Sequence, residues 1–271
     1  MRRTLHQRVP RLPARCGQTD EPRPDRRRLQ ARFAALVVAW LAVLVTGMGT
    51  WLLAGLAAGP AVAADTSDAL FDLDALEIQI APGLGYLQVP HGEETVTLMR
   101  HQDPGHTIVA PYQNTARPCP PYCVQPMQIA PGVETIGELE LIDYLRRIAA
   151  GDNSILVIDS RSREWVERGT IPGATHLPYT RLDPATATPQ QIAETLQFDF
   201  GAAYTGGLWH FNNVKTLVLF CNGNWCGQSP TNIKALLGLG YPAHRIKWYR
   251  GGIQAWEQLG LTTVKPVTIL P

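Results

Sequence analysis

The chain has 271 residues, of which 45% are hydrophobic and 17% charged, and a formal net charge of +1. This is the composition of an ordinary globular protein. Ten arginines and three acidic residues precede Phe33, whereas the chain from Asp65 onward carries 14 basic and 20 acidic side chains. That larger part is mildly acidic and has no basic face suited to a phosphate backbone, which excludes nucleic acid as a partner.

The first segment predicts export. Residues 33–59 are uncharged and apolar, and roughly 20 such residues suffice to span a bilayer. The arginines before them predict a cytoplasmic N-terminus. Ala61-Val62-Ala63 fits a small-x-small cleavage site, so residues 1–64 are either a cleaved signal peptide or a retained membrane anchor. In both cases we expect the remainder to be periplasmic or otherwise extracytoplasmic.

Residues 65–130 are expected to form a small extension. The alternating runs Tyr86–Val89 and Thr95–Met99 flank a turn-rich segment and predict a hairpin. The stretch 117–126 is too rich in proline for a helix or a central strand. We interpret it as a fixed, extended connector that carries Cys119 and Cys123.

From Pro131 the pattern changes to short apolar strands that alternate with helices. Strands are expected at Ile155–Ile158, Ala174–Leu177, Thr216–Phe220 and Ile246–Tyr249, and helices at Leu141–Ile148, Arg163–Arg168, Gln190–Leu196, from Ser229 and at Ile253–Leu259. This order predicts an α/β domain over residues 131–271, with a parallel sheet flanked by helices. Ligands of such sheets bind outside the carboxyl ends of the strands.

Cys221 lies at such an end, directly after the apolar run Thr216–Phe220. Ser229 is a preferred N-cap and Pro230 suits the first helical position, so we expect a helix to begin there and to stop at Gly240. The loop between strand and helix exposes backbone N–H groups at a positive helix end. It therefore favours an anion, either a cysteine thiolate or the charged end of a substrate.

Three sequence blocks carry a resemblance to a known family. They are Ile158–Glu164 with its Asp-x-Arg, Gly169–Ala174 followed by His176–Pro178, and Leu239–Tyr241 followed by Gly251–Trp256. In this order they resemble the rhodanese superfamily of sulfurtransferases over roughly residues 131–265. The resemblance implies that Cys221 is a nucleophile that takes sulfane sulfur from thiosulfate, polysulfide or a persulfide. It would pass this sulfur to a thiol acceptor, without a cofactor or metal.

The cysteine loop departs from that family. Asn224 and Cys226 stand where the family usually has glycine and often arginine, and no arginine occurs between Cys221 and Pro230. Gly227 excludes the Cys-x5-Arg arrangement of the phosphatases built on the same fold. The anion would instead be held by backbone donors and side chains of the loop, with Arg250 as a replacement cation at its mouth. The loop residues concerned are Gly223, Asn224, Trp225, Gly227, Gln228 and Ser229.

Cys226 adds a second thiol to this loop. It suits a resolving reaction in which its sulfur attacks a Cys221 persulfide, expels sulfide and leaves a disulfide. Two alternatives stay open. An inert Cys221–Cys226 bridge would make the domain a non-catalytic binding module, and a readily reduced bridge would make it a thiol-disulfide oxidoreductase.

Cys119 and Cys123 are expected to form a local disulfide that stiffens the connector, because export and the flanking prolines favour it. Exchange of disulfides with Cys221 or Cys226 is the alternative. A zinc site made of all four cysteines is disfavoured by their spacing.

The remaining polar candidates are expected to be structural. Asp159, Arg161 and Glu164 suit an internal ion pair, and His176 suits a core or rim position. His210 lies in an aromatic cluster and is more typical of a packed side chain than of a catalytic one. Trp248 and Trp256 are expected in the core.

Overall fold

The structure is a computed structural model that describes residues 72–270. The predicted leader, including the apolar run 33–59, lies outside the described residues. Among residues 72–270, no helix combines the length and the apolarity needed to cross a membrane.

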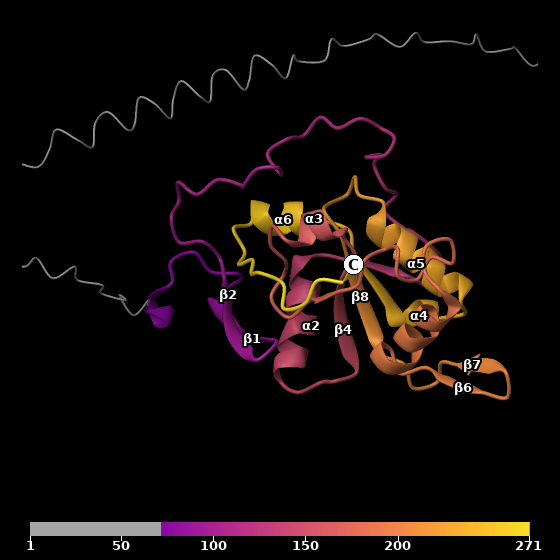
Figure 1. Cartoon of the computed structure of the whole chain (residues 1–271). Helices are drawn as coiled ribbons and strands as arrows, with labels where there is room; N and C mark the ends of the chain where they lie inside the picture. Colours follow the sequence, from indigo (N-terminus) through magenta and orange to yellow (C-terminus); the bar gives the residue numbers. More distant parts are fainter. Residues whose placement is uncertain (1–71, 271) are drawn as a thin grey trace, which may run out of the picture. The chain divides into compact units, whose positions relative to one another are not determined.

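A five-stranded parallel sheet forms the centre of the fold, as predicted, in the strand order β3-β9-β8-β4-β5. The strands are β3 (Glu134–Ile136), β4 (Ile155–Asp159), β5 (Thr175–His176), β8 (Thr216–Phe220) and β9 (Ile246–Tyr249). Strand β8, which leads to Cys221, lies in the middle of the sheet (Figure 1). The edge strand β3 has only three residues, too few for an alternating pattern to reveal it in the sequence.

Side chains alternate between the two faces of the sheet and build two cores. On β8, Val218 and Phe220 enter one core, whereas Leu217 and Leu219 enter the other. The first core contains residues of α2 (Glu138–Ala149) and α6 (Gly252–Gln258). The second contains residues of α4 (Pro189–Glu194) and α5 (Gln228–Gly238). Helices therefore cover both faces, and burial of each large apolar side chain contributes about 1.5–3 kcal/mol.

The smaller elements differ in detail from the expected ones. Helix α3 is Arg163–Val166, α4 continues into a π-helical turn at Thr195–Asp199, and 3-10 turns cover Leu73–Ala75 and Ala243–Arg245. An additional antiparallel hairpin joins β6 (Ala203–Thr205) to β7 (Leu208–His210). His210 ends this hairpin and is exposed, so it lies on the surface rather than in a packed aromatic cluster.

The predicted hairpin of the extension is confirmed and belongs to the core. Strands β1 (Tyr86–His91) and β2 (Glu94–Met99) pair antiparallel over their full length. Val89 and Leu98 are fully buried in the same cluster as Leu141 and Leu145 of α2. The extension thus packs directly on the α/β domain. After the hairpin, residues 100–133 lead back to this domain.

Candidate functional site

Cys221 lies at the carboxyl end of the central strand β8 and is only 2% exposed. The following helix α5 begins at Gln228, with Gly227 as the N-cap residue and no side-chain cap. The prediction that Ser229 is the N-cap and Pro230 the first helical residue is therefore wrong. Ser229 lies inside the first turn, where its hydroxyl points at the cysteine instead of at a helix N–H group.

Hydrogen bonds converge on the Cys221 sulfur. Ser229 Oγ donates to Cys221 Sγ over 3.1 Å, and Trp248 Nε1 donates to Ser229 Oγ over 3.1 Å. Burial raises the pKa of the Cys221 thiol, but hydrogen bonds from the Cys226 thiol, the Ser229 hydroxyl and the backbone N–H groups of Ser229 and Gly223 outweigh it. The pKa of Cys221 is lowered as a result, which favours the thiolate, the nucleophilic form.

Cys226 is the second buried thiol, 4% exposed, and the structure has both cysteines free. Burial raises its pKa well above the usual value, and the hydrogen bond to Cys221 and the Cys221 charge raise it further. Its Sγ donates to Gln228 Oε1 over 3.7 Å and accepts from Asn222 Nδ2 over 3.9 Å. The pair is thus asymmetric, with a thiolate favoured at Cys221 and a protonated thiol at Cys226.

Helix α6 holds the cysteine loop from the side. Ile253 N donates to the Cys221 carbonyl over 3.0 Å, and Gln254 N donates to the Asn222 carbonyl over 2.9 Å. Gly252 has φ of +59°, and a Cβ there would meet the Cys221 carbonyl oxygen and lie 2.6 Å from the backbone nitrogen of Gly223. Only glycine fits this contact, which explains the glycine at the first position of α6.

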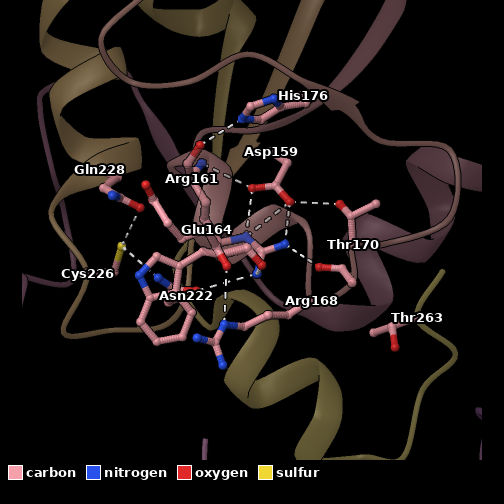
Figure 2. A network of polar contacts seen from close by, with 12 residues as sticks. Asp159, Arg161, Glu164, Arg168, Thr170, His176, Asn222, Cys226, Gln228 and Thr263 are labelled. Carbon is pink, nitrogen blue, oxygen red and sulfur yellow. Dashed lines mark hydrogen bonds and ion pairs between the residues drawn. The ribbon is translucent and has the colours of Figure 1, made fainter. Parts of the chain in front are cut away.

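We call the side of the loop that faces the end of β4 its lower side, and the side that faces the connector its upper side. A buried ion pair lies on the lower side, and Figure 2 shows its contacts. Arg161 Nη2 lies 2.6 Å from Asp159 Oδ2, both side chains are almost fully buried, and Thr170 Oγ1 donates to the same carboxylate oxygen over 2.7 Å. His176 Nε2 bonds the Arg161 carbonyl over 2.8 Å, in agreement with a core histidine. Glu164 is exposed and makes no ion pair among the described residues, so the expected contribution of Glu164 is wrong.

Tyr112 of the extension joins this ion pair to the cysteine loop. Arg161 Nη1 donates to Tyr112 Oη over 2.9 Å, and Tyr112 Oη donates to Asn222 Oδ1 over 3.1 Å. Burial raises the pKa of Tyr112 to about 12, although the nearby Arg161 opposes this shift. The phenol therefore stays neutral and donates a hydrogen bond to Asn222 Oδ1, while the amide nitrogen of Asn222 faces Cys226.

The proline-rich connector covers the loop from above. Cys119 and Cys123 form the predicted local disulfide, with Cα atoms 4.6 Å apart. Inside this ring, Tyr122 packs edge-on against Trp225, with ring centroids 5.5 Å apart. Trp225 packs in turn on Cys221 and Cys226. The connector and Trp225 thus close the site over the two thiols.

Arg250 secures the connector rather than the cysteine loop. Its Nη2 donates to the Gln125 carbonyl over 2.8 Å, and its Nε donates to the Pro126 carbonyl over 3.1 Å. Gln125 N in turn donates to the Asn224 carbonyl over 2.8 Å. Arg250 also lines a cavity of about 300 Å³ together with Asn224 and Trp225. Its role as a replacement cation stays a prediction.

The predicted loop residues have different positions around the two sulfurs. The backbone N–H groups of Gly223 and Ser229 point to Cys221. Those of Gln228 and of Asn222, the residue after Cys221, point to Cys226. Asn224 is exposed. Sequence reasoning missed five residues of the site, and only Asn222, next to Cys221, carried a positional signal. These are Tyr112, Arg117, Asn222, Trp248 in its polar role and Gln254.

Within the described part of the chain, no cluster of three or more histidine, cysteine or acidic side chains is arranged to hold a metal ion. The disulfide removes Cys119 and Cys123 from any such set, because their sulfurs are bonded to each other.

Comparisons with known proteins agree with this architecture. Residues 141–259 match the profile of the rhodanese-like domain family. Similar solved structures include a human single-domain sulfurtransferase, with 23% identity over 46% of this chain and 95% of that protein and a TM-score of 0.31. A 3-mercaptopyruvate sulfotransferase from Escherichia coli has 21% identity over 45% of this chain and 43% of its own, with a TM-score of 0.31.

A thiosulfate sulfurtransferase from Pseudomonas aeruginosa has 16% identity over 51% of this chain and 21% of its own, with a TM-score of 0.32. No curated protein matches the chain in sequence. Residues 141–259 thus match the rhodanese-like domain family, and the parallel sheet with helices on both faces matches the rhodanese fold.

Proposed function

We propose that this chain, whose residues 141–259 match the rhodanese-like domain family, is a sulfurtransferase that carries sulfane sulfur as a persulfide on Cys221. One observation carries the proposal. Cys221 is a free thiol at the carboxyl end of the central strand, and donors from Ser229, Cys226 and the loop backbone lower its pKa. An inert structural cysteine in an apolar site would show the opposite shift.

In the first step, the Cys221 thiolate attacks the sulfane sulfur of thiosulfate. The sulfur-sulfur bond of the donor breaks, sulfite leaves with the electron pair, and a Cys221 persulfide anion remains. The Ser229 hydroxyl and the N–H groups of Gly223 and Ser229, which hold the thiolate, are placed to stabilise the new anion as well. Polysulfide and protein persulfides supply sulfur by the same displacement.

In the second step, the persulfide has two routes. A thiol acceptor can take the terminal sulfur and release Cys221. Alternatively, the Cys226 sulfur attacks Cys221 Sγ and the bond between Cys221 Sγ and the terminal sulfur breaks. The terminal sulfur takes up the Cys226 proton and leaves as hydrosulfide, and a Cys221–Cys226 disulfide forms. The raised pKa of Cys226 keeps this thiol protonated. Its S–H group therefore first donates a hydrogen bond to the persulfide anion, and its sulfur attacks Cys221 only afterwards.

Thiol-disulfide oxidoreduction is the second candidate, because Cys221 and Cys226 are both free thiols and belong to one buried cluster. The non-catalytic module would instead need both cysteines to be blocked. A free-thiol titration of the unreduced protein separates these cases, since two titratable thiols support chemistry at the loop and none supports the locked module.

Intact-mass measurement after reduction and incubation with thiosulfate tests the sulfurtransferase directly. We expect one added sulfur on the wild type, none on Cys221→Ser and a longer-lived adduct on Cys226→Ser, which lacks the resolving thiol. Absence of the adduct on the wild type, together with unchanged thiocyanate formation from cyanide by Cys221→Ser, would overturn the proposal.

Export remains part of the proposal. Its support is the apolar run 33–59 with arginines before it and the disulfide of the connector, a bond typical of oxidising compartments. Cell fractionation with an antibody to the domain tests it. Mass analysis of the N-terminus then distinguishes a cleaved leader from a membrane anchor.

A further inference from the structure

Arg117 of the connector lies at the cysteine loop with part of its hydrogen-bonding capacity unused. Its guanidinium carbon is 3.9 Å from the centroid of the Trp225 ring and 5.9 Å from that of Tyr122. Nη2 donates to the Pro111 carbonyl over 3.0 Å, whereas Nε is buried and has no hydrogen-bond partner. A buried donor without a protein partner costs free energy, so an acceptor atom of a ligand would stabilise it.

The charge of Arg117 is also not balanced by a carboxylate. Within residues 72–270, the side chains in ion pairs with acidic groups are Arg146, Arg147, Arg161, Arg163 and Lys247. Arg117 is absent from that set, and stacking on an aromatic ring leaves the edge of a guanidinium free for a planar or tetrahedral oxyanion.

Trp225 connects Arg117 to the nucleophile. The indole contacts the guanidinium on one side and packs in the cluster of Cys221 and Cys226. Its Nε1 donates to Gln254 Oε1 over 2.6 Å. Beside it lies the cavity of about 300 Å³, whose lining includes Trp225, Gln254, Arg250 and Thr115; Arg117 follows Thr115 by two residues in the chain and does not itself line the cavity. This volume is sufficient for a small oxyanion next to the cover of the thiols.

We propose that Arg117 is the anion-binding residue of this site and supplies from the connector the cation that the cysteine loop lacks. The ligand class is a small sulfur oxyanion such as thiosulfate, bound through the free edge of the guanidinium and the unpartnered Nε. Displacement of Trp225 from Gln254 then brings the anion to Cys221, which is otherwise closed off. This inference rests on the proposed function only for the identity of the anion.

Alkylation of the reduced full chain tests the inference without any sulfur transfer. Iodoacetate and iodoacetamide form similar adducts on a thiolate but differ in charge, and the ratio of their rates at Cys221, normalised to free cysteine, reports electrostatic recruitment. Peptide mass mapping assigns the modified residue. We expect Arg117→Gln to lower the normalised ratio by roughly tenfold, as expected for loss of one charge-assisted contact.

Two further variants make the result specific. The guanidinium carbon of Arg168 lies 5.4 Å from the centroid of the Trp165 ring, and Trp165 also packs against the cysteine cluster. Arg168→Gln therefore removes one positive charge that, like that of Arg117, lies on an aromatic ring beside the cysteines. It should leave the ratio unchanged, whereas Arg117→Lys should keep more than half of the recruitment. An equal ratio in the wild type and Arg117→Gln, or an equal loss in Arg168→Gln, would overturn the inference.

Thiosulfate itself links the inference to the proposed function. Calorimetric titration of thiosulfate into Cys221→Ser should show binding that Arg117→Gln in the same background weakens by roughly tenfold. If the wild type forms no persulfide while this difference is present, the sulfurtransferase proposal fails and the anion site stands. If the wild type forms the persulfide and Arg117→Gln has an unchanged KM for thiosulfate, the anion site fails alone.

Discussion

Two arginines flank the cysteine loop, and their environments are opposite. Arg161 lies below the loop, fully buried, with Asp159, Tyr112, Trp165, Gly169 and Asn222 as partners for its donors. Arg117 lies above the loop, half-buried, on the face of Trp225 with one donor unused. A charge whose donors are all occupied has no capacity for a ligand, so the lower arginine holds the loop and the upper one is available for chemistry.

The same contrast applies to the segments that carry these residues. The lower network joins β4 to Tyr112 and to the loop by hydrogen bonds between fully buried groups. The upper connector contacts the loop through ring faces and edges and one backbone hydrogen bond from Gln125 to Asn224. We therefore expect substitutions below the loop to affect stability mainly, and substitutions above it to affect reactivity mainly.

The largest effect is expected from Arg161→Met. Removal of the guanidinium leaves the buried Asp159 carboxylate without its countercharge, which should lower the free energy of unfolding by about 3–5 kcal/mol. Urea denaturation followed by fluorescence measures this change. Arg147→Met, which removes an exposed partner of Asp152, is the matched control and should cost less than about 1 kcal/mol. A similar small loss for both variants would contradict the structural role of Arg161.

Tyr112→Phe should have the next largest effect. The substitution keeps the ring and removes the hydroxyl that accepts from Arg161 and donates to Asn222, so about 1–3 kcal/mol of stability should be lost. Denaturation with urea measures it, and Tyr204→Phe on the exposed β6–β7 hairpin is the control. Loss of stability only in Tyr112→Phe would confirm that the extension supports the loop from below; equal values would refute it.

Ser229→Ala should change reactivity more than stability. The hydroxyl stabilises the Cys221 thiolate, so its loss raises the pKa of Cys221, while one neutral hydrogen bond contributes only about 1 kcal/mol to folding. The rate of iodoacetamide modification rises as the pH increases through this pKa. We expect the midpoint of the wild type below that of an ordinary cysteine, and a shift to higher pH in the variant.

Thr231→Ala is the control for Ser229→Ala. Its hydroxyl donates to the Gly227 carbonyl in the same helical turn but not to Cys221. An unshifted Ser229→Ala profile, or an equal shift in both variants, would show that the hydroxyl of Ser229 does not set the pKa of the nucleophile.

The smallest effect on stability is expected from Arg117→Gln. A partly exposed cation on an aromatic ring contributes about 0.5–1 kcal/mol, and removal of the unpartnered Nε offsets part of the loss. The melting temperature should therefore change little, although recruitment of anions changes strongly. A destabilisation as large as that of Arg161→Met would place both arginines in the same structural class and remove the contrast.

Several parts of the site could be predicted because they follow from local sequence. An apolar run before Cys221 and a helix after it place the sulfur at a strand end, and β-strand alternation assigns Val218 and Leu219 to opposite faces. The expected export and the prolines around Cys119 and Cys123 predicted their local disulfide. The role of Ser229 was misassigned because a serine before a proline suits an N-cap, whereas the sulfur of Cys221 competes for its hydroxyl.

The sequence by itself determined the α/β order of the domain and the position of two cysteines in the loop after an apolar strand, because periodicity and turn residues act over a few positions. The role of Cys221 as nucleophile is what the family resemblance implies. Only the tertiary structure decided which side chains surround the thiols. Tyr112 reaches Arg161 across 49 positions and Asn222 across 110 positions of the chain. Contacts at such separations depend on how the extension packs against the sheet, and no local pattern encodes that packing. The position of Arg117 over the Trp225 ring likewise became visible only in the tertiary structure.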